Sequence, residues 1–172
     1  MKAAILLLVS LLLLGGCTST PQQVVLAPTL IPQPYSPEVA SELDLDVIDN
    51  RPQRHLLQIN ENQEQRKLLS ASRSPGKLLK ESVSGGLSQQ GYQLSPTADT
   101  VMTIEIEKML INLDQRLASY EAQNDIALKV IVRTGGHTLT KRFSSKGNSH
   151  GPLKADVAVL ERLFNDQLGA LI

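Results

Sequence analysis

The chain has 172 residues, and its 17 lysines and arginines balance 17 aspartates and glutamates, so the formal net charge is zero. This balance offers no basic surface for nucleic acid, and five aromatic residues without a tryptophan leave little for stacking on bases. A single cysteine excludes an internal disulfide, so the fold depends on packing in a chain long enough for one domain.

Residues 1–16 have the pattern of a secretory signal peptide. Lys2 supplies a positive charge, residues 3–14 are predominantly apolar, and two glycines precede Cys17. Twelve helical residues span roughly 18 Å, which is too short for a hydrocarbon core of about 30 Å. We therefore predict cleavage between Gly16 and Cys17 rather than a permanent membrane span.

The segment from Leu14 to Cys17 resembles the bacterial lipobox, which consists of an apolar residue, two small residues and a cysteine. In proteins with this signal the cysteine sulfur receives a diacylglyceryl group, and the new amino terminus is acylated after cleavage. Several acyl chains anchor a protein firmly, whereas a single chain is marginal. Thr18 stands where an aspartate commonly retains Gram-negative lipoproteins at the inner membrane. The pattern predicts lipidation at Cys17 and a location on the periplasmic face of the outer membrane.

The lipidated cysteine and the residues after it, 17–37, are predicted to form an extended tether. Residues 18–37 are uncharged and contain five of the nine prolines, which prevents a helix. Residues 24–26 and 30–31 are too apolar for a purely solvated linker, so docking on the domain as an edge strand is an equal alternative. The rest of the chain, 38–172, is assigned to a single periplasmic domain.

The first half of this domain is predicted to contain three short strands and a helix. Alternating apolar and polar residues indicate a strand at residues 43–48, and two short strands are expected at 55–59 and 67–69 around the polar turn 60–65. Ser74 and Pro75 suit the N-cap and first position of a helix, and Gly91 suits its left-handed C-cap. Two glycines inside this helix, Gly85 and Gly86, favour a close approach of the helix to the sheet.

The second half is predicted to contain two long strands, a hairpin and a closing helix. Residues 101–114 change inward parity near Glu107 and Lys108, which indicates a β-bulge or a strand that extends beyond its core. Residues 118–132 alternate in the manner of a strand with one wet face. The glycine pair 135–136 suits a two-residue hairpin turn.

The register of this hairpin can be predicted from its apolar residues. Pairing Thr134 with His137 places Val132 opposite Leu139, and it places Leu128 opposite Phe143 on the same face. Lys141 then faces Val130. Residues 148–152 are predicted to be a loop, and apolar residues recur at helical spacing from 153 to 171. The resulting fold class is α+β, an antiparallel sheet with two helices packed on one face.

Residue types that serve in catalytic and metal sites are scattered along the chain. The histidines at positions 55, 137 and 150 lack the spacing of metal ligands, and the lone cysteine is assigned to lipid. The sequence contains neither a nucleophile-elbow motif nor a phosphate-binding loop. We therefore expect no catalytic residue, metal ion or cofactor.

Three groups of charged residues have a structural explanation that we favour over a functional one. Glu105 and Glu107 share a strand face, where paired carboxylates are usually solvated. A basic group on the last strand protects a sheet edge more often than it binds anionic lipid or glycan. A group of aspartates lacks the glycine of a calcium loop. The basic group is Lys141, Arg142 and Lys146, and the aspartates are Asp44, Asp46 and Asp49.

The order and spacing of these elements, with short matches at Ser72-Arg73 and Gly91-Tyr92, are similar to the YajG-type lipoproteins of Gram-negative bacteria. The resemblance covers the lipobox and about residues 24–171. It implies an outer-membrane lipoprotein with a compact α/β domain and offers no catalytic residues. The layout also resembles auxiliary lipoproteins of envelope transport systems, although fold alone is weak evidence for function.

These observations predict a non-catalytic lipoprotein, anchored at Cys17, that binds a protein partner in the envelope or assists assembly there. The expected partner surface is the wet face of the sheet or residues 24–31. A periplasmic binder of lipid or glycan fragments is a second hypothesis, and it requires a cavity between the sheet and the helices. A hydrolase is a third, and it requires a cleft where titratable groups converge.

Overall fold

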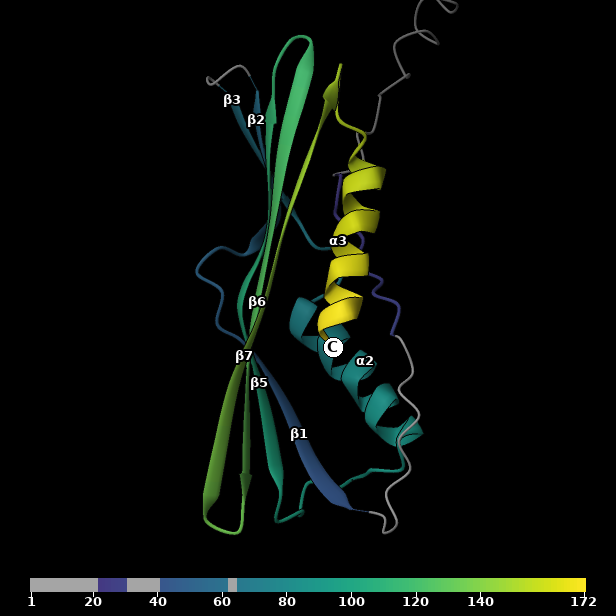
Figure 1. The fold of residues 1–172 in the computed structure, drawn as a ribbon, viewed down its shortest axis with the longest axis vertical. Coiled ribbons are helices and arrows are strands. Elements are labelled where there is room, and N and C mark those ends of the chain that lie inside the picture. The colour runs from purple at the N-terminus through teal and green to yellow at the C-terminus, as the bar shows by residue number, and fades with distance from the viewer. Residues whose placement is uncertain (1–21, 31–40, 62–64) are drawn as a thin grey trace, which may run out of the picture.

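The computed structural model describes residues 22–30, 41–61 and 65–172 (Figure 1). The predicted signal peptide (1–16), the lipobox with Cys17, and residues 18–21 and 31–37 of the predicted tether lie outside the described residues. Seven strands and two helices follow in the order β1 (Glu42–Asp49), β2 (His55–Glu61), β3 (Gln65–Ser70), α2 (Pro75–Gln89), β4 (Gln93–Leu94), β5 (Val101–Gln115), β6 (Ser119–Thr134), β7 (His137–Pro152) and α3 (Val157–Leu171).

The sheet is mixed, so the prediction of a purely antiparallel sheet was wrong. The long strand β5 pairs along one edge with β1 and then with β2, both in parallel, and β4 is parallel to β1. Its other edge pairs antiparallel with β6, which in turn pairs with β7. Parallel neighbours need a long crossover connection, and α2 lies in the connection between β3 and β5. Alternation of side chains reports burial but not strand direction, which explains the error.

The predicted β-bulge and hairpin register are confirmed. Ile106 pairs with Leu128 and Lys108 pairs with Ala127, so Glu107 is the extra residue on β5. This inserted residue reverses the inward parity of the strand, as the sequence indicated. In the hairpin, Thr134 pairs with His137 around two glycines of positive φ, and all the predicted pairs follow, including Val130 with Lys141.

The boundaries of β7 and α3 differ from the prediction. The expected loop at 148–152 is the last part of β7, which stays paired with β6 as far as Pro152. Proline is tolerated there because β7 is an edge strand and Pro152 is its final residue. The helix begins at Val157 and not at residue 153, and the Asp156 side chain caps it by accepting a hydrogen bond from the Ala158 N–H at 2.9 Å.

Helix α2 begins at Pro75 and ends at a glycine cap, as predicted. Gly91 has a φ of 90°, and its N–H donates to the Ser88 carbonyl while the Tyr92 N–H donates to the Leu87 carbonyl. These two bonds form a Schellman motif. The internal glycines do not mark a close helix–sheet contact. A Cβ at Gly85 would meet nothing within 4 Å, and one at Gly86 would lie 3.5 Å from Leu30 of the N-terminal segment.

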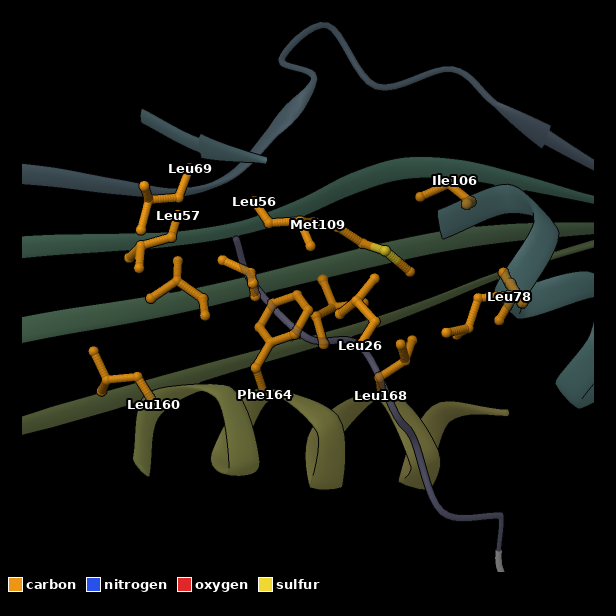
Figure 2. Close-up of a cluster of buried hydrophobic side chains, with 14 of the residues drawn as sticks. Leu26, Leu56, Leu57, Leu69, Leu78, Ile106, Met109, Leu160, Phe164 and Leu168 are labelled. Carbon is orange, nitrogen blue, oxygen red and sulfur yellow. The ribbon is translucent and has the colours of Figure 1, made fainter. Parts of the chain in front are cut away.

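The two helices lie on one face of the sheet, with α3 beside the half that contains β2 and α2 beside the half that contains β1 (Figure 1). Leu160, Phe164 and Leu168 are spaced by four residues on α3 and are fully buried. Figure 2 shows them pointing at the strand residues Leu57 and Met109. Apolar side chains therefore occupy the space between α3 and the sheet.

The N-terminal segment 22–30 docks on the domain and decides the open question about residues 24–26 (Figure 2). Val24 and Leu26 are buried in the same core as α3. The Val24 N–H donates to the Ser70 carbonyl at 3.0 Å and its carbonyl accepts from the Ser72 N–H at 2.9 Å, which forms a single bridge rather than a continuous strand. None of the helices in the described residues has both the length and the apolar character needed to cross a bilayer.

Candidate functional site

Both glutamates singled out in the sequence form ion pairs across the sheet. The Glu105 carboxylate lies 3.1 Å from the Lys129 ammonium, and the Glu107 carboxylate lies 3.1 Å from the Arg142 guanidinium. Two carboxylates that are each paired with a cation do not form the shared-proton pair of an acid–base site. In the basic group, the Lys141 ammonium lies 4.9 Å from the centre of the Phe143 ring, a cation–π contact on the edge strand.

The aspartates near β1 are separated rather than gathered. Asp46 pairs with Lys80 at 3.6 Å. Asp49 accepts two hydrogen bonds from the Arg51 guanidinium at 2.8 and 2.9 Å, and these bonds hold the pKa of its carboxyl below the usual range. Within the described ranges, no group of three or more histidine, cysteine, aspartate or glutamate side chains is placed to hold a metal ion.

The histidines lie on three different parts of the fold. His55 begins β2, His137 follows the hairpin turn and His150 lies near the end of β7. Burial lowers the pKa of His55, because a charged imidazole loses hydration there. The structure therefore does not bring the histidines of the sequence analysis together.

A cleft of about 550 Å³ lies at the end of the molecule where the described chain begins. We call this end the anchor end; it consists of residues 22–23, the end of β2, the start of β3, the β5–β6 turn and the β7–α3 connection. The first two turns of α3 line the cleft as well. The opposite end, called the hairpin end, is the β6–β7 turn with the adjoining residues of both strands (Figure 1).

The cleft is lined by charges of both signs. Glu61 and Lys154 face each other across one side at 4.0 Å, and Lys67 donates a hydrogen bond to the Gln22 side chain at 3.3 Å on the other. Serine, cysteine and histidine are all absent from the described residues that line it. The described lining residues therefore do not supply a nucleophile of the Ser–His or Cys–His type.

Gln115 is the polar side chain that organises the anchor end. It is the last residue of β5, its exposed fraction is 8%, and its amide reaches both neighbouring loops. The amide nitrogen donates to the carbonyls of Arg116 at 2.9 Å, Ser119 at 3.2 Å and Leu153 at 3.1 Å. The amide oxygen accepts from the Ala155 N–H at 2.9 Å. One buried glutamine thus clamps the β5–β6 turn to the β7–α3 connection.

Two leucines protrude from the loops that this glutamine holds. Leu117 in the β5–β6 turn is 93% exposed, and Leu153 in the β7–α3 connection is 71% exposed. Leu153 has a φ of 64°, the single positive value at a non-glycine residue in the part of the chain that the structure describes. That conformation costs roughly 1–2 kcal/mol for a residue with a Cβ, and glycine or asparagine would adopt it more readily.

Sequence reasoning assigned both of these features to other roles. The predicted strand ends at residue 114, although Gln115 continues the inward parity of Ile111 and Leu113, and a buried glutamine at such a position requires hydrogen-bond partners. Leu153 was placed at the start of the closing helix because its spacing fits the apolar stripe. No pattern in a single sequence indicates its positive φ.

Comparison with known proteins finds relatives of this chain by sequence and a likeness by fold. The sequence model of a family described as "Uncharacterized lipoprotein" matches residues 28–172. The lipoprotein YajG of Escherichia coli K12 is 24% identical over 151 residues, which cover 86% of this chain and 78% of that protein, and YajG of Escherichia coli O6:H1 matches equally. The crystal structure of protein XCC0632 from Xanthomonas campestris has a TM-score of 0.58 at 12% identity, over 87% of this chain and 89% of that one. The last match is a likeness of fold alone.

Proposed function

Because the chain belongs to this family of uncharacterized lipoproteins, we propose that it is a non-catalytic lipoprotein anchored through acyl chains on Cys17 to the periplasmic face of the outer membrane. The observation that carries the proposal is the sequence Leu14–Cys17, followed after four residues by a segment that packs into the core of the domain. The domain is therefore joined to the anchor by a short connection at a defined end.

The anchor is tested by Cys17→Ser, with the acyl mass on the amino-terminal peptide and membrane fractionation as measurements. Serine has no thiol to form the thioether, so the acyl mass disappears and the protein leaves the membrane fraction. A Cys17→Ser protein that still sediments with outer membranes would refute the lipobox interpretation.

The choice of membrane is tested separately at Thr18. Thr18→Asp introduces the residue that commonly retains lipoproteins at the inner membrane, so the lipidated protein moves to the inner-membrane fraction of a density gradient. Ser19→Asp adds the same charge one residue later and serves as the matched control, which stays with the outer membrane. If both variants distribute between the two membrane fractions as the parent protein does, the residue at position 18 does not determine the choice of membrane.

The same proposal includes an accessory role with a protein partner in the envelope, and the face of the sheet opposite the helices is the surface available for it. A polar ladder follows this face, in which Asn60 donates to Asn112 at 3.1 Å and to Asp114 at 2.7 Å. The other surface considered is residues 24–31, and two of its apolar side chains, Val24 and Leu26, are already buried in the core of this chain. A photo-crosslinking residue at Gln123, exposed on β6 beside Asn112, is expected to capture a discrete envelope protein in intact cells. The absence of any crosslinked product would count against this role.

A further inference from the structure

The position of Gln22 limits which end of the domain can face the membrane. Gln22 is held at the anchor end by the hydrogen bond from Lys67, and it lines the same cleft as Lys154 and Gln115. Five peptide units separate Cys17 from Gln22, so their Cα atoms lie at most about 18 Å apart. If Cys17 carries the lipid, as proposed above, the anchor end lies next to the bilayer and the hairpin end points away from it.

The side chains that protrude at the anchor end are suited to such a surface. Leu117 and Leu153 are the two most exposed large apolar side chains of the described residues, at 93% and 71%. Their loops are joined directly, because the Leu153 N–H donates to the Ala118 carbonyl at 3.0 Å. Isolated exposed leucines are ordinary on protein surfaces, but two on adjoining loops at the end nearest the anchor form an apolar tip.

The backbone under this tip is built to keep the leucines outward. Gln115 binds the carbonyls of Arg116 and Leu153 from beneath, which fixes both loops. Leu153 retains a left-handed backbone that glycine or asparagine would adopt with less strain. A strained backbone that presents an exposed leucine is an observation that calls for a functional explanation.

The charges around the tip are compatible with a phospholipid surface but do not dominate it. Arg116 and Lys154 directly adjoin the two leucines in sequence, and cations near an anionic bilayer are favourable. Glu61 and Asp156 lie in the same region and offset them. Burial of the two leucines is therefore the main contribution of this end to membrane binding, and the basic side chains beside them contribute less.

We propose that the tip formed by residues 116–118 and 153–154 inserts Leu117 and Leu153 into the interfacial region of the membrane that holds the lipid anchor. The anchor and the tip then make two contacts with one leaflet, which sets the orientation of the domain. This proposal rests on the lipidation of Cys17 and adds a second contact to it.

The test uses the full-length lipidated protein, purified in detergent and reconstituted into vesicles of phosphatidylethanolamine and phosphatidylglycerol. Since Cys17 is the one cysteine and is blocked by lipid, an introduced cysteine is a unique thiol for an environment-sensitive fluorophore. One reporter replaces Ala118 at the tip, and a matched reporter replaces Leu139, which is 67% exposed near the hairpin end. Each is compared with and without the double substitution Leu117→Asp, Leu153→Asp.

The expected result is a blue-shifted emission at position 118 that is quenched by brominated lipid, no such change at position 139, and loss of the signal at 118 in the double aspartate variant. Aspartate tolerates the positive φ of residue 153 better than leucine does, so the variant remains folded, and an unchanged melting temperature verifies this.

The proposal is overturned if the emission at both positions is that of a fluorophore in water, or if the two positions respond alike. It is also overturned if the double aspartate variant keeps the signal at position 118 while the protein still floats with the vesicles. Those results would leave the anchor itself standing. A protein that lacks the acyl mass and fails to float overturns the anchor, and the membrane-contacting tip with it.

Discussion

The anchor end and the hairpin end of the sheet both expose leucines, but they support them in different ways. Leu139 at the hairpin end lies in a regular strand, beside a turn whose two glycines adopt positive φ without strain. Leu153 at the anchor end itself adopts a positive φ and is held there by Gln115. The backbone at the hairpin end therefore has the conformations that its residue types prefer, whereas the backbone at Leu153 does not.

The exposure of Leu139 is therefore incidental, whereas the exposure of Leu153 is maintained by the surrounding structure. Every residue of β7 from 137 to 142 is exposed, so the exposure of Leu139 belongs to this end of the edge strand as a whole and needs no further explanation. At the anchor end a buried amide with four hydrogen bonds stabilises a conformation that the chain would not otherwise prefer. The comparison predicts that substitutions with similar chemistry have unequal effects at the two ends.

The largest effect is expected from Gln115→Leu. Leucine fills a similar space but removes all four hydrogen bonds of the amide. The Ala155 N–H and the carbonyls of Arg116 and Leu153 lose their bond to Gln115, whereas the Ser119 carbonyl keeps its bond from the Arg116 N–H, so the free energy of unfolding falls by about 3 kcal/mol. Amide hydrogen exchange at Ala155 increases at the same time, because its acceptor is lost. Denaturant unfolding and exchange measured by mass spectrometry check both expectations.

The matched control for this substitution is Thr134→Val at the hairpin end. It removes one exposed hydrogen bond, from the Thr100 hydroxyl at 2.9 Å, and keeps the shape of the side chain. The expected loss is about 0.5 kcal/mol, with no change in exchange at Ala155. Equal losses from the two substitutions would show that the anchor end is not specially maintained.

The fold could be predicted from the sequence wherever a local rule decides it. The parity change at Glu107 and the register of the hairpin follow from the two-residue period of a strand, and the structure has both. The direction in which β1 and β2 pair with β5 could not be predicted, because alternation is identical in parallel and antiparallel strands. Docking of Val24 and Leu26 was left open because it depends on contacts with α3 and β3, which are distant in sequence.

The anchor end was harder to predict than the fold for the same reason. The inward parity of Gln115 was readable, but its partners come from Ser119 and Ala155 on separate segments. The end of β7 was assigned to a loop because glycine, serine and proline are frequent there, yet pairing with β6 overrides those preferences. Features that depend on tertiary contact are thus the ones that a single sequence does not reveal.

An intermediate effect is expected from Asn165→Ala on α3, which tests how firmly the N-terminal segment is attached to this helix. The Asn165 amide accepts from the Ala27 N–H at 2.9 Å and donates to the Val25 carbonyl at 3.0 Å. Losing both bonds lowers the stability of the docked segment by about 1–2 kcal/mol, so exchange at Ala27 accelerates and proteases cut the segment sooner.

The neighbouring residue supplies the control for that experiment. Asp166 is exposed on the same helix, so Asp166→Ala is expected to leave exchange at Ala27 unchanged. Equal exchange at Ala27 in both variants and the parent protein would show that the two hydrogen bonds of Asn165 do not hold the segment. The burial of Val24 and Leu26 would then be sufficient to dock it.

The smallest effect is the one most specific to the comparison. We expect Leu153→Gly to raise the free energy of unfolding and Leu139→Gly to lower it. At Leu153 glycine relieves roughly 1–2 kcal/mol of backbone strain. It also raises the entropy of the unfolded chain, which costs about 0.5–1 kcal/mol of stability. The free energy of unfolding therefore rises by about 0.5 kcal/mol. At Leu139 the same substitution weakens a regular strand and lowers stability by about 1 kcal/mol. Thermal unfolding of the two variants measures the difference. A loss of stability at both positions would mean that Leu153 packs usefully against the domain, and its exposure would then no longer distinguish the anchor end from the hairpin end.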